Sequence, residues 1–156
     1  MTMEILDLLN KNQMEFEIEA ESKKDVIKKM SKMFLNDGVI TSIDKYVDSV
    51  MEREQMGTTG VGEGIAIPHG KSSVVTTSSI AFAKLKTPVD WDALDGNKVS
   101  IIFMLSIPDE SESKEHLRVL SLLAQRLMDD DVIESLKQSR NKDDIINIFK
   151  NKESID

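Results

Sequence analysis

His69 and His116 are the two histidines of this 156-residue sequence, and His69 lies within a glycine-rich stretch, Gly57 to Lys71. An imidazole with its ordinary pKa of about 6.5 is mostly neutral at pH 7, so it can act as a nucleophile or a base. The stretch, GTTGVGEGIAIPHGK, contains five of the seven glycines. Glycine lets a backbone turn sharply or approach a bound group closely. The pattern indicates a backbone cradle beside a reactive imidazole.

Pro68 constrains the backbone just before His69. Its ring fixes its own φ, and it biases Ile67 toward extended backbone. The short apolar run 65–67 therefore predicts a strand with His69 at its end, which is where α/β folds bind ligands. Glycine amides and threonine hydroxyls ahead of this strand are expected to converge on an anion. The predicted anion-binding loop comprises Thr58, Thr59, Gly60, Gly62 and Gly64.

Other ligand classes fit this stretch poorly. Gly70-Lys71-Ser72 looks like the end of a Walker A loop, but the first glycine of that motif would have to stand where Ile65 is. No G-x-G-x-x-G opens a helix, so the dinucleotide fingerprint is also missing. Two histidines without a third ligand do not make a metal site, and the sequence has no cysteine. We expect neither a metal nor a cofactor.

Arg53 and His116 are the other two candidates. Arg53 falls in the last turns of a predicted helix, where it either complements the helix dipole or presents its planar donors to phosphate oxygens. His116 falls in the first turn of a later helix, where negative charge is favoured. It is either a solvated helix-start residue or a neighbour that steadies the reactive imidazole or a bound anion.

The strands that position these residues are predicted from their hydrophobic patterns. Residues 16–20 alternate between apolar and charged, and residues 79–85 form a second apolar run. Residues 99–107 are apolar on both faces, as expected of a central buried strand. Pro88 to Gly96, between the last two strands, is rich in turn formers and predicts a loop.

Cap-like residues predict the helices. Ser22 starts the first, which ends at Gly38, and Thr41 starts the second. Three later helices are predicted over residues 113–128, 131–137 and 141–150. The apolar stripe of the first of these three consists of Leu117, Leu120, Ala124, Leu127 and Met128.

Helices on both sides of a largely buried set of strands imply an α/β fold. We expect a single layered domain over residues 1–156, with a mixed β-sheet flanked by helices on both faces. Residues 151–156 form a polar tail that we expect to be frayed.

The composition narrows the classes of partner. The net charge of −8 argues against non-specific binding of nucleic acid and favours basic protein partners. No window approaches the roughly 18 apolar residues of a membrane span, so direct membrane insertion is not expected. The N-terminus lacks the basic region of a signal peptide, which favours a cytoplasmic location.

Five segments together resemble the enzyme IIA domains of the bacterial phosphotransferase system, in the fructose/mannitol class. They are Arg53-Glu54, TTGVGEGIAIPHGK, PVDWDALDG, the buried strand that ends in Pro108, and HLRVLSLLAQRL from His116. The resemblance covers nearly the whole chain. The PVDWDALDG segment is most similar to fructose-type members.

The resemblance implies a function and a role for each candidate. His69 would accept a phosphoryl group from phospho-HPr, at Nε2 as the family favours, and pass it to a IIB component. His116 would be the second active-site histidine, and Arg53 would hold the phosphoryl group. The chain would be a phosphotransferase component of sugar transport that uses no cofactor. The IIB component would be a separate chain acting with a IIC membrane component.

Two other functions remain open. The first is a regulatory IIA-like protein, of the nitrogen-regulatory or transcription-control type, whose His69 phosphorylation state is read by a partner. The second is an anion-binding domain that transfers nothing.

Overall fold

Six strands form one mixed sheet in the computed structural model of this chain, which describes residues 4–109 and 113–153. The strands are β1 (Leu9–Ile18), β2 (Gly60–Gly62), β3 (Ile65–Ala66), β4 (His69–Ser72), β5 (Ser79–Val89) and β6 (Val99–Pro108). Their order is β1-β5-β6-β3-β2, and β4 also pairs with β6. β5 runs antiparallel to β6, whereas β3 and β4 run parallel to it.

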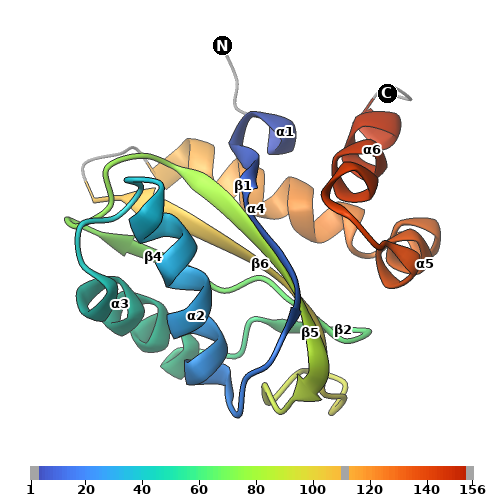
Figure 1. Cartoon of the computed structure of the whole chain (residues 1–156), viewed down its shortest axis with the longest axis horizontal. Coiled ribbons are helices and arrows are strands. Elements are labelled where there is room, and N and C mark those ends of the chain that lie inside the picture. Colours follow the sequence, from blue (N-terminus) through green and yellow to red (C-terminus); the bar gives the residue numbers. More distant parts are fainter. Residues whose placement is uncertain (1–3, 110–112, 154–156) are drawn as a thin grey trace.

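Helices cover both faces of the sheet (Figure 1). They are α1 (Ile5–Leu8), α2 (Lys23–Asn36), α3 (Ile43–Gln55), α4 (Ser113–Arg126), α5 (Asp130–Gln138) and α6 (Lys142–Glu153). α2 and α3 bury one apolar cluster against the sheet, and α4, α5 and α6 bury another on the opposite face. This arrangement confirms the predicted α/β class with a mixed sheet. No helix within the described ranges is long and apolar enough to cross a membrane.

β6 is the central strand, as its two-sided apolar pattern predicts. Phe103 faces the α4–α6 side, where its ring lies 5.5 Å from that of Phe149. Ile102 and Met104 face the α2–α3 side. A strand that is buried on both faces and paired on both edges is a rigid reference for whatever its neighbours carry.

The first two predicted helices are α2 and α3, and they start at or next to their predicted caps. The Ser22 side chain accepts a hydrogen bond from the backbone N–H of Asp25, and Gly38 ends the segment with a φ of 74°. The predicted start at Thr41 is wrong by one residue, because Ser42 is the cap of α3. The backbone N–H of Thr41 instead donates to the carbonyl of Val74, at 2.9 Å.

The outer strands differ from their predicted limits. β1 begins at Leu9 rather than Phe16, because backbone pairing with β5 extends into a polar stretch that has no strand pattern. β5 runs through Pro88 to Val89, where the sequence predicts a loop. The β5–β6 register is irregular between Lys84 and Val89, which accommodates a proline without a backbone N–H.

The apolar stripe predicted for α4 is rotated. Leu117 and Met128 are 61% and 79% exposed. Leu127 is buried as predicted, but it shares the buried face with Val119, Leu123 and His116, which were not in the predicted stripe. Leucines are so frequent in this helix that more than one face fits a helical period.

The last two helices occur where predicted. The side chain of Asn141 accepts from the N–H of Asp144, at 2.9 Å, as expected of a cap. α6 continues to Glu153, so the first half of the expected frayed tail is helical, and residues 154–156 lie outside the described part of the chain.

Lys84 ties β5 to the end of α5. Its ammonium donates to the carbonyls of Leu136, Lys137 and Ser139 at 3.1, 2.8 and 2.9 Å, and burial lowers its pKa. The three ammonium protons therefore satisfy carbonyls that the helix end leaves open.

We predict that Lys84→Met lowers the free energy of unfolding by about 2 kcal/mol, because it leaves those carbonyls unpaired. Chemical denaturation measures the change. Lys86→Met is the matched control, since that lysine lies on the same strand and makes an exposed ion pair with Glu19. The control is expected to change stability by less than about 0.5 kcal/mol, and equal losses in both variants would contradict the prediction.

Candidate functional site

His69 begins β4, at a point where the edge of the sheet is interrupted. Ile65 pairs with Ile101, and His69 pairs with Leu105, so β3 and β4 follow β6 in one continuous register. Pairing lapses at Ile67 and Pro68, and a proline has no N–H to offer a ladder. The sequence predicts His69 at the end of a strand, whereas the structure places it where the strand resumes.

A local hydrogen bond fixes the tautomer of His69. Its Nδ1 lies 3.2 Å from the carbonyl oxygen of Ile67. A carbonyl only accepts, so Nδ1 carries the proton and donates it. In the neutral ring the lone pair is then on Nε2. The side chain is half-buried, so the ring is held without being closed off from solvent.

The surroundings of His69 keep it neutral. Burial is the largest cause of its lowered pKa, because a buried site disfavours the charged form. The hydrogen bond to Ile67 opposes this effect, and the positive charge of Arg53 adds to it. The carboxylate of Glu54 raises the pKa in turn, but the balance lies below the ordinary value. The imidazole is therefore mostly neutral at pH 7.

Arg53 lies in the last turn of α3, as predicted, within electrostatic reach of His69. Its Nη1 donates to the carbonyl of Gly57, at 2.8 Å. That bond uses one of five guanidinium donors, so the remaining fork can bind an oxyanion. The structure thus brings together two of the predicted site residues.

The buried side chain of Glu54 stabilises the backbone next to His69 and Arg53, a role that the sequence did not reveal. Its carboxylate is buried, pairs with Lys23 at 2.9 Å, and accepts from both the N–H and the hydroxyl of Thr59. The indole N–H of Trp91 donates to the same hydroxyl, at 3.2 Å. Lys23 and Trp91 come from distant segments, so the signal in the sequence was only an acidic residue beside Arg53.

This buried network reaches His69 through the backbone. The carbonyl of Thr59 accepts from the N–H of Ile67, at 3.0 Å, and the carbonyl of Ile67 accepts from His69. Both backbone polar groups of Ile67, its N–H and its carbonyl, are therefore hydrogen-bonded. Glu54 fixes Thr59, Thr59 fixes Ile67, and Ile67 orients the imidazole.

The predicted anion-binding loop makes contacts within the protein. The hydroxyl of Thr58 donates to the carbonyl of Trp91 at 2.8 Å and accepts from the N–H of Gly60. A side chain at Gly60 would meet Ala93 at 2.8 Å, so this glycine is required by close packing. Whether these residues also contact a phosphoryl group stays a prediction.

The next two loop glycines allow a tight turn. Gly62 and Gly64 have φ values of 110° and 79°, which favour glycine. Between them, the N–H of Glu63 donates to the carboxylate of Asp95, at 2.9 Å. Asp95 thus occupies a donor that a nest would present to an anion, and the roles of Gly62 and Gly64 at the phosphoryl group also stay predictions.

His116 is buried rather than a solvated helix-start residue. It is 3% exposed, and its Nε2 lies 2.6 Å from the hydroxyl of Ser78, just before β5. It projects from α4, which covers the face of the sheet that carries Leu105, the strand partner of His69. The second imidazole is therefore on the same side of the sheet as the first.

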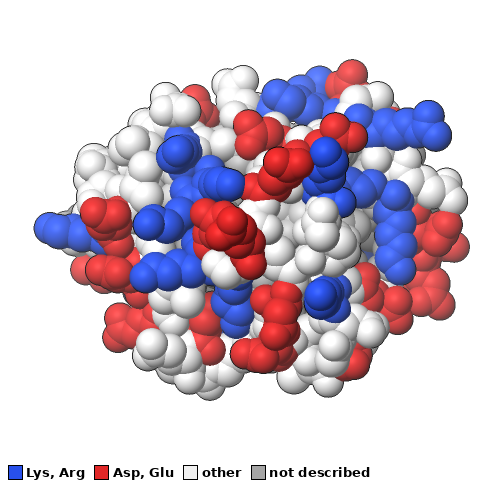
Figure 2. Space-filling view, turned by 60° about the horizontal axis from the view of Figure 1, so that its bottom comes forward, with Lys and Arg blue, Asp and Glu red and all other residues white. Residues whose placement is uncertain are grey.

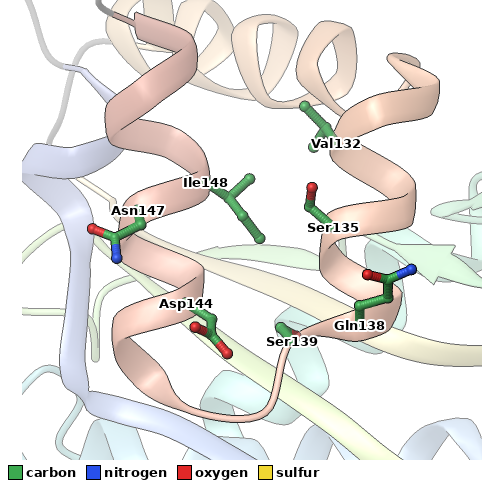
Figure 3. A pocket seen from close by; sticks show the side chains of 7 residues that line it. All are labelled: Val132, Ser135, Gln138, Ser139, Asp144, Asn147 and Ile148. Carbon is green, nitrogen blue, oxygen red and sulfur yellow. The ribbon is translucent and has the colours of Figure 1, made fainter.

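A hollow of about 360 Å³ lies elsewhere, between α5 and α6 (Figure 3). The carboxylate of Asp144, on its wall, accepts from the N–H of Arg140 and so serves the start of α6. None of the candidate residues lines this hollow. Among residues 4–109 and 113–153, no three His, Cys, Asp or Glu side chains are grouped so that they could hold a metal ion.

We predict that His69 titrates below the ordinary value of about 6.5, because burial and Arg53 both disfavour its charged form. NMR of the imidazole carbons against pH measures the midpoint. Stability that depends on the neutral ring is complete above pH of about 6.5 and declines as pH falls toward the lower folded-state pKa. Arg53→Gln should raise the midpoint. A wild-type midpoint at or above the ordinary value would contradict this account.

Comparisons with known proteins agree with this geometry. The family model described as "Phosphoenolpyruvate-dependent sugar phosphotransferase system, EIIA 2" matches residues 7–152. The chain is 35% identical over 147 residues to the fructose-specific EIIABC component of Bacillus subtilis, covering 94% of this chain and 23% of that protein. It therefore spans less than a quarter of that relative's length.

Two solved structures are also similar. The nitrogen regulatory protein IIA-Ntr from Neisseria meningitidis is 32% identical, with a TM-score of 0.86, covering 93% of this chain and 98% of that one. Enzyme IIA for mannitol from Escherichia coli, solved in complex with phosphorylated enzyme IIB, is 20% identical, with a TM-score of 0.75 over 92% and 99% of the two chains, and it shows the fold alone. Because the family match extends over nearly the whole sequence, this chain belongs to the EIIA 2 family of the phosphoenolpyruvate-dependent sugar phosphotransferase system.

Proposed function

We propose that this chain is a phosphocarrier of sugar transport that accepts a phosphoryl group from phospho-HPr on His69 and passes it to a IIB component. The observation that carries the proposal is the hydrogen bond from Nδ1 of His69 to Ile67, which leaves the Nε2 lone pair available on a half-buried ring. EIIA domains are phosphotransferase components, and the family match extends over residues 7–152. We further propose that the whole chain, 1–156, is a single such domain.

The proposed transfer is an in-line displacement at phosphorus. The Nε2 lone pair of His69 forms a new N–P bond while the N–P bond of the donor phosphohistidine breaks. The electron pair of the broken bond returns to the donor imidazole. The proton on Nδ1 of His69 stays in its bond to Ile67, so the positive charge that develops on the attacking ring is shared with that carbonyl. The reverse steps pass the group to IIB.

Stabilisation of the moving charge falls to Arg53 and His116. Phosphoryl transfer depends mostly on positioning and on offsetting the charge of the equatorial oxygens. The free donors of Arg53 match those oxygens, and His116 is held by Ser78 on the same side of the sheet as His69. The predicted loop ligands are Thr58, Thr59, Gly60, Gly62 and Gly64. Some N–H groups of this loop already donate to Thr58 and Asp95, so they would have to release these partners to bind a phosphoryl group.

The charge of the chain suits a basic donor surface. Its net charge is −8, and opposite fields accelerate encounter. Positive and negative side chains are interspersed over the face shown in Figure 2, so this face carries no large area of a single sign. The proposed attraction to HPr therefore rests on the net charge and not on a patch seen on this face.

We predict that His69→Ala takes up no phosphate from phosphoenolpyruvate, enzyme I and HPr, because the accepting nitrogen is gone. Intact-protein mass spectrometry measures the uptake. Lys86→Met, an exposed change on β5, is the control and should label like wild type. Wild-type labelling of the His69 variant would remove this residue from the mechanism.

We predict a different defect for His116→Ala. The protein should still be phosphorylated on His69, but transfer to a IIB component should slow by about 100-fold, the usual cost of losing one electrostatic partner. The rate is measured by quenching the reaction at successive times and determining how much phosphate has moved from this protein to IIB. A rate equal to that of wild type would leave His116 as a packing residue.

A second function is favoured by the similarity to IIA-Ntr, which covers 98% of that regulatory protein. In this alternative His69 is also phosphorylated, and a partner protein reads its state. A fructose-type IIB component separates the two functions. Rapid movement of phosphate from His69 to IIB supports transport, whereas retention of phosphate together with capture of a partner in one phosphorylation state supports regulation.

A further inference from the structure

Gly70, the residue after His69, lies where α3 comes closest to β4. A Cβ atom built there would lie 2.8 Å from Cγ2 of Val50 and 3.2 Å from Cε1 of Tyr46, and closer still to Oγ of Ser49. Real Cβ atoms essentially never come within about 3.0 Å of another heavy atom, so the contacts with Ser49 and Val50 are too close, and the contact with Tyr46 is tight. The φ of Gly70 is not positive, so its backbone does not require glycine. Glycine is needed at this position because α3 occupies the space that a side chain would fill.

One of these three helix residues, Tyr46, is hydrogen-bonded to the central strand at this level. The hydroxyl of Tyr46 donates to the carbonyl of Leu105, at 2.9 Å, and Leu105 is the strand partner of His69. Ser49 donates to the carbonyl of Tyr46, at 2.6 Å. The N–H of Leu105 donates to the carbonyl of Pro68, at 3.0 Å. The helix, the central strand and the backbone around His69 therefore meet at one junction.

Arg53 lies one turn beyond this junction on the same helix. It follows Ser49 by four residues, so the two side chains share a face of α3. The position of α3 on β4 thus determines where the guanidinium lies relative to His69, the neighbour of Gly70.

We propose that Gly70 is a positioning residue for phosphoryl transfer, since its missing side chain lets α3 approach β4 and so sets the separation of Arg53 from His69. The proposal rests on the proposed function only for its kinetic consequence. A side chain at residue 70 forces α3 outward and carries Arg53 with it. Misplacement of a catalytic group by about 1 Å costs about 100-fold in rate.

The test is a set of variants that fills the space and then restores it. Gly70→Ala should slow phosphoryl transfer from HPr by about 10- to 100-fold and raise the NMR titration midpoint of His69, because the charge of Arg53 moves away. Adding Ser49→Ala and Val50→Ala removes the two nearest atoms, so the triple variant should recover much of the rate and a lower midpoint. Ser49→Ala with Val50→Ala alone is the control.

Arg53→Gln separates positioning from a general loosening of the site. In that background, Gly70→Ala should raise the midpoint of His69 less than it does in wild type, because the charge that it displaces is absent. Ser49→Val pushes on the same contact from the helix side and should give a smaller change in the same direction, which keeps the test available if Gly70→Ala does not fold.

Three results would overturn the proposal. They are an unchanged rate and midpoint in both Gly70→Ala and Ser49→Val, an equal rise in midpoint with and without Arg53, and a triple variant no better than the single one. The titration does not require phosphorylation, so failure of the proposed function would show as an unlabelled wild-type protein and leave this test intact.

Discussion

The hydrogen bond between Nδ1 of His69 and the carbonyl of Ile67 is the contact on which the site depends. It spans two residues, so the chain provides it locally, and Pro68 favours an extended backbone at Ile67. The bond decides which nitrogen has the lone pair. It also limits rotation of the ring, so Nε2 keeps one direction relative to Arg53.

Long-range contacts hold this local arrangement from two sides. On one side, the buried network of Glu54, Thr59 and Trp91 holds the backbone N–H of Ile67 through the carbonyl of Thr59. On the other, α3 lies against Gly70, and its Tyr46 binds the strand that pairs with His69. The backbone on both sides of the imidazole is thereby held by the interior while the ring stays partly exposed. The phosphoryl transfer that we propose, with two partners in turn, would need both properties.

The sequence predicted what depends on near neighbours. The Ser22 cap, the Gly38 end and the central strand were recovered because each follows from a few adjacent residues. The α3 cap was missed because Thr41 and Ser42 are both good caps, and a bond from Thr41 to the distant Val74 decides between them. The buried face of α4 was misplaced because only the sheet selects among its leucines.

The sequence predicted the candidate residues of the site better than the residues that hold them in place. His69 and Arg53 stood out by type and position, and the structure brings them within electrostatic reach. Ser78 was missed because its partner His116 lies 38 residues away, and Glu54 was missed because its burial depends on the distant Lys23 and Trp91 as well as on the nearby Thr59. The threonine hydroxyls, expected to face an anion, instead donate inside the protein, since the same loop must close over Trp91.

Heteronuclear NMR of the phosphorylated, ¹⁵N-labelled protein tests the central claim most directly. Coupling between phosphorus and the ring nitrogens shows which atom of His69 bears the phosphoryl group. The account predicts phosphate on Nε2, with Nδ1 still protonated and bonded to Ile67. Phosphate on Nδ1, or on His116, would contradict it.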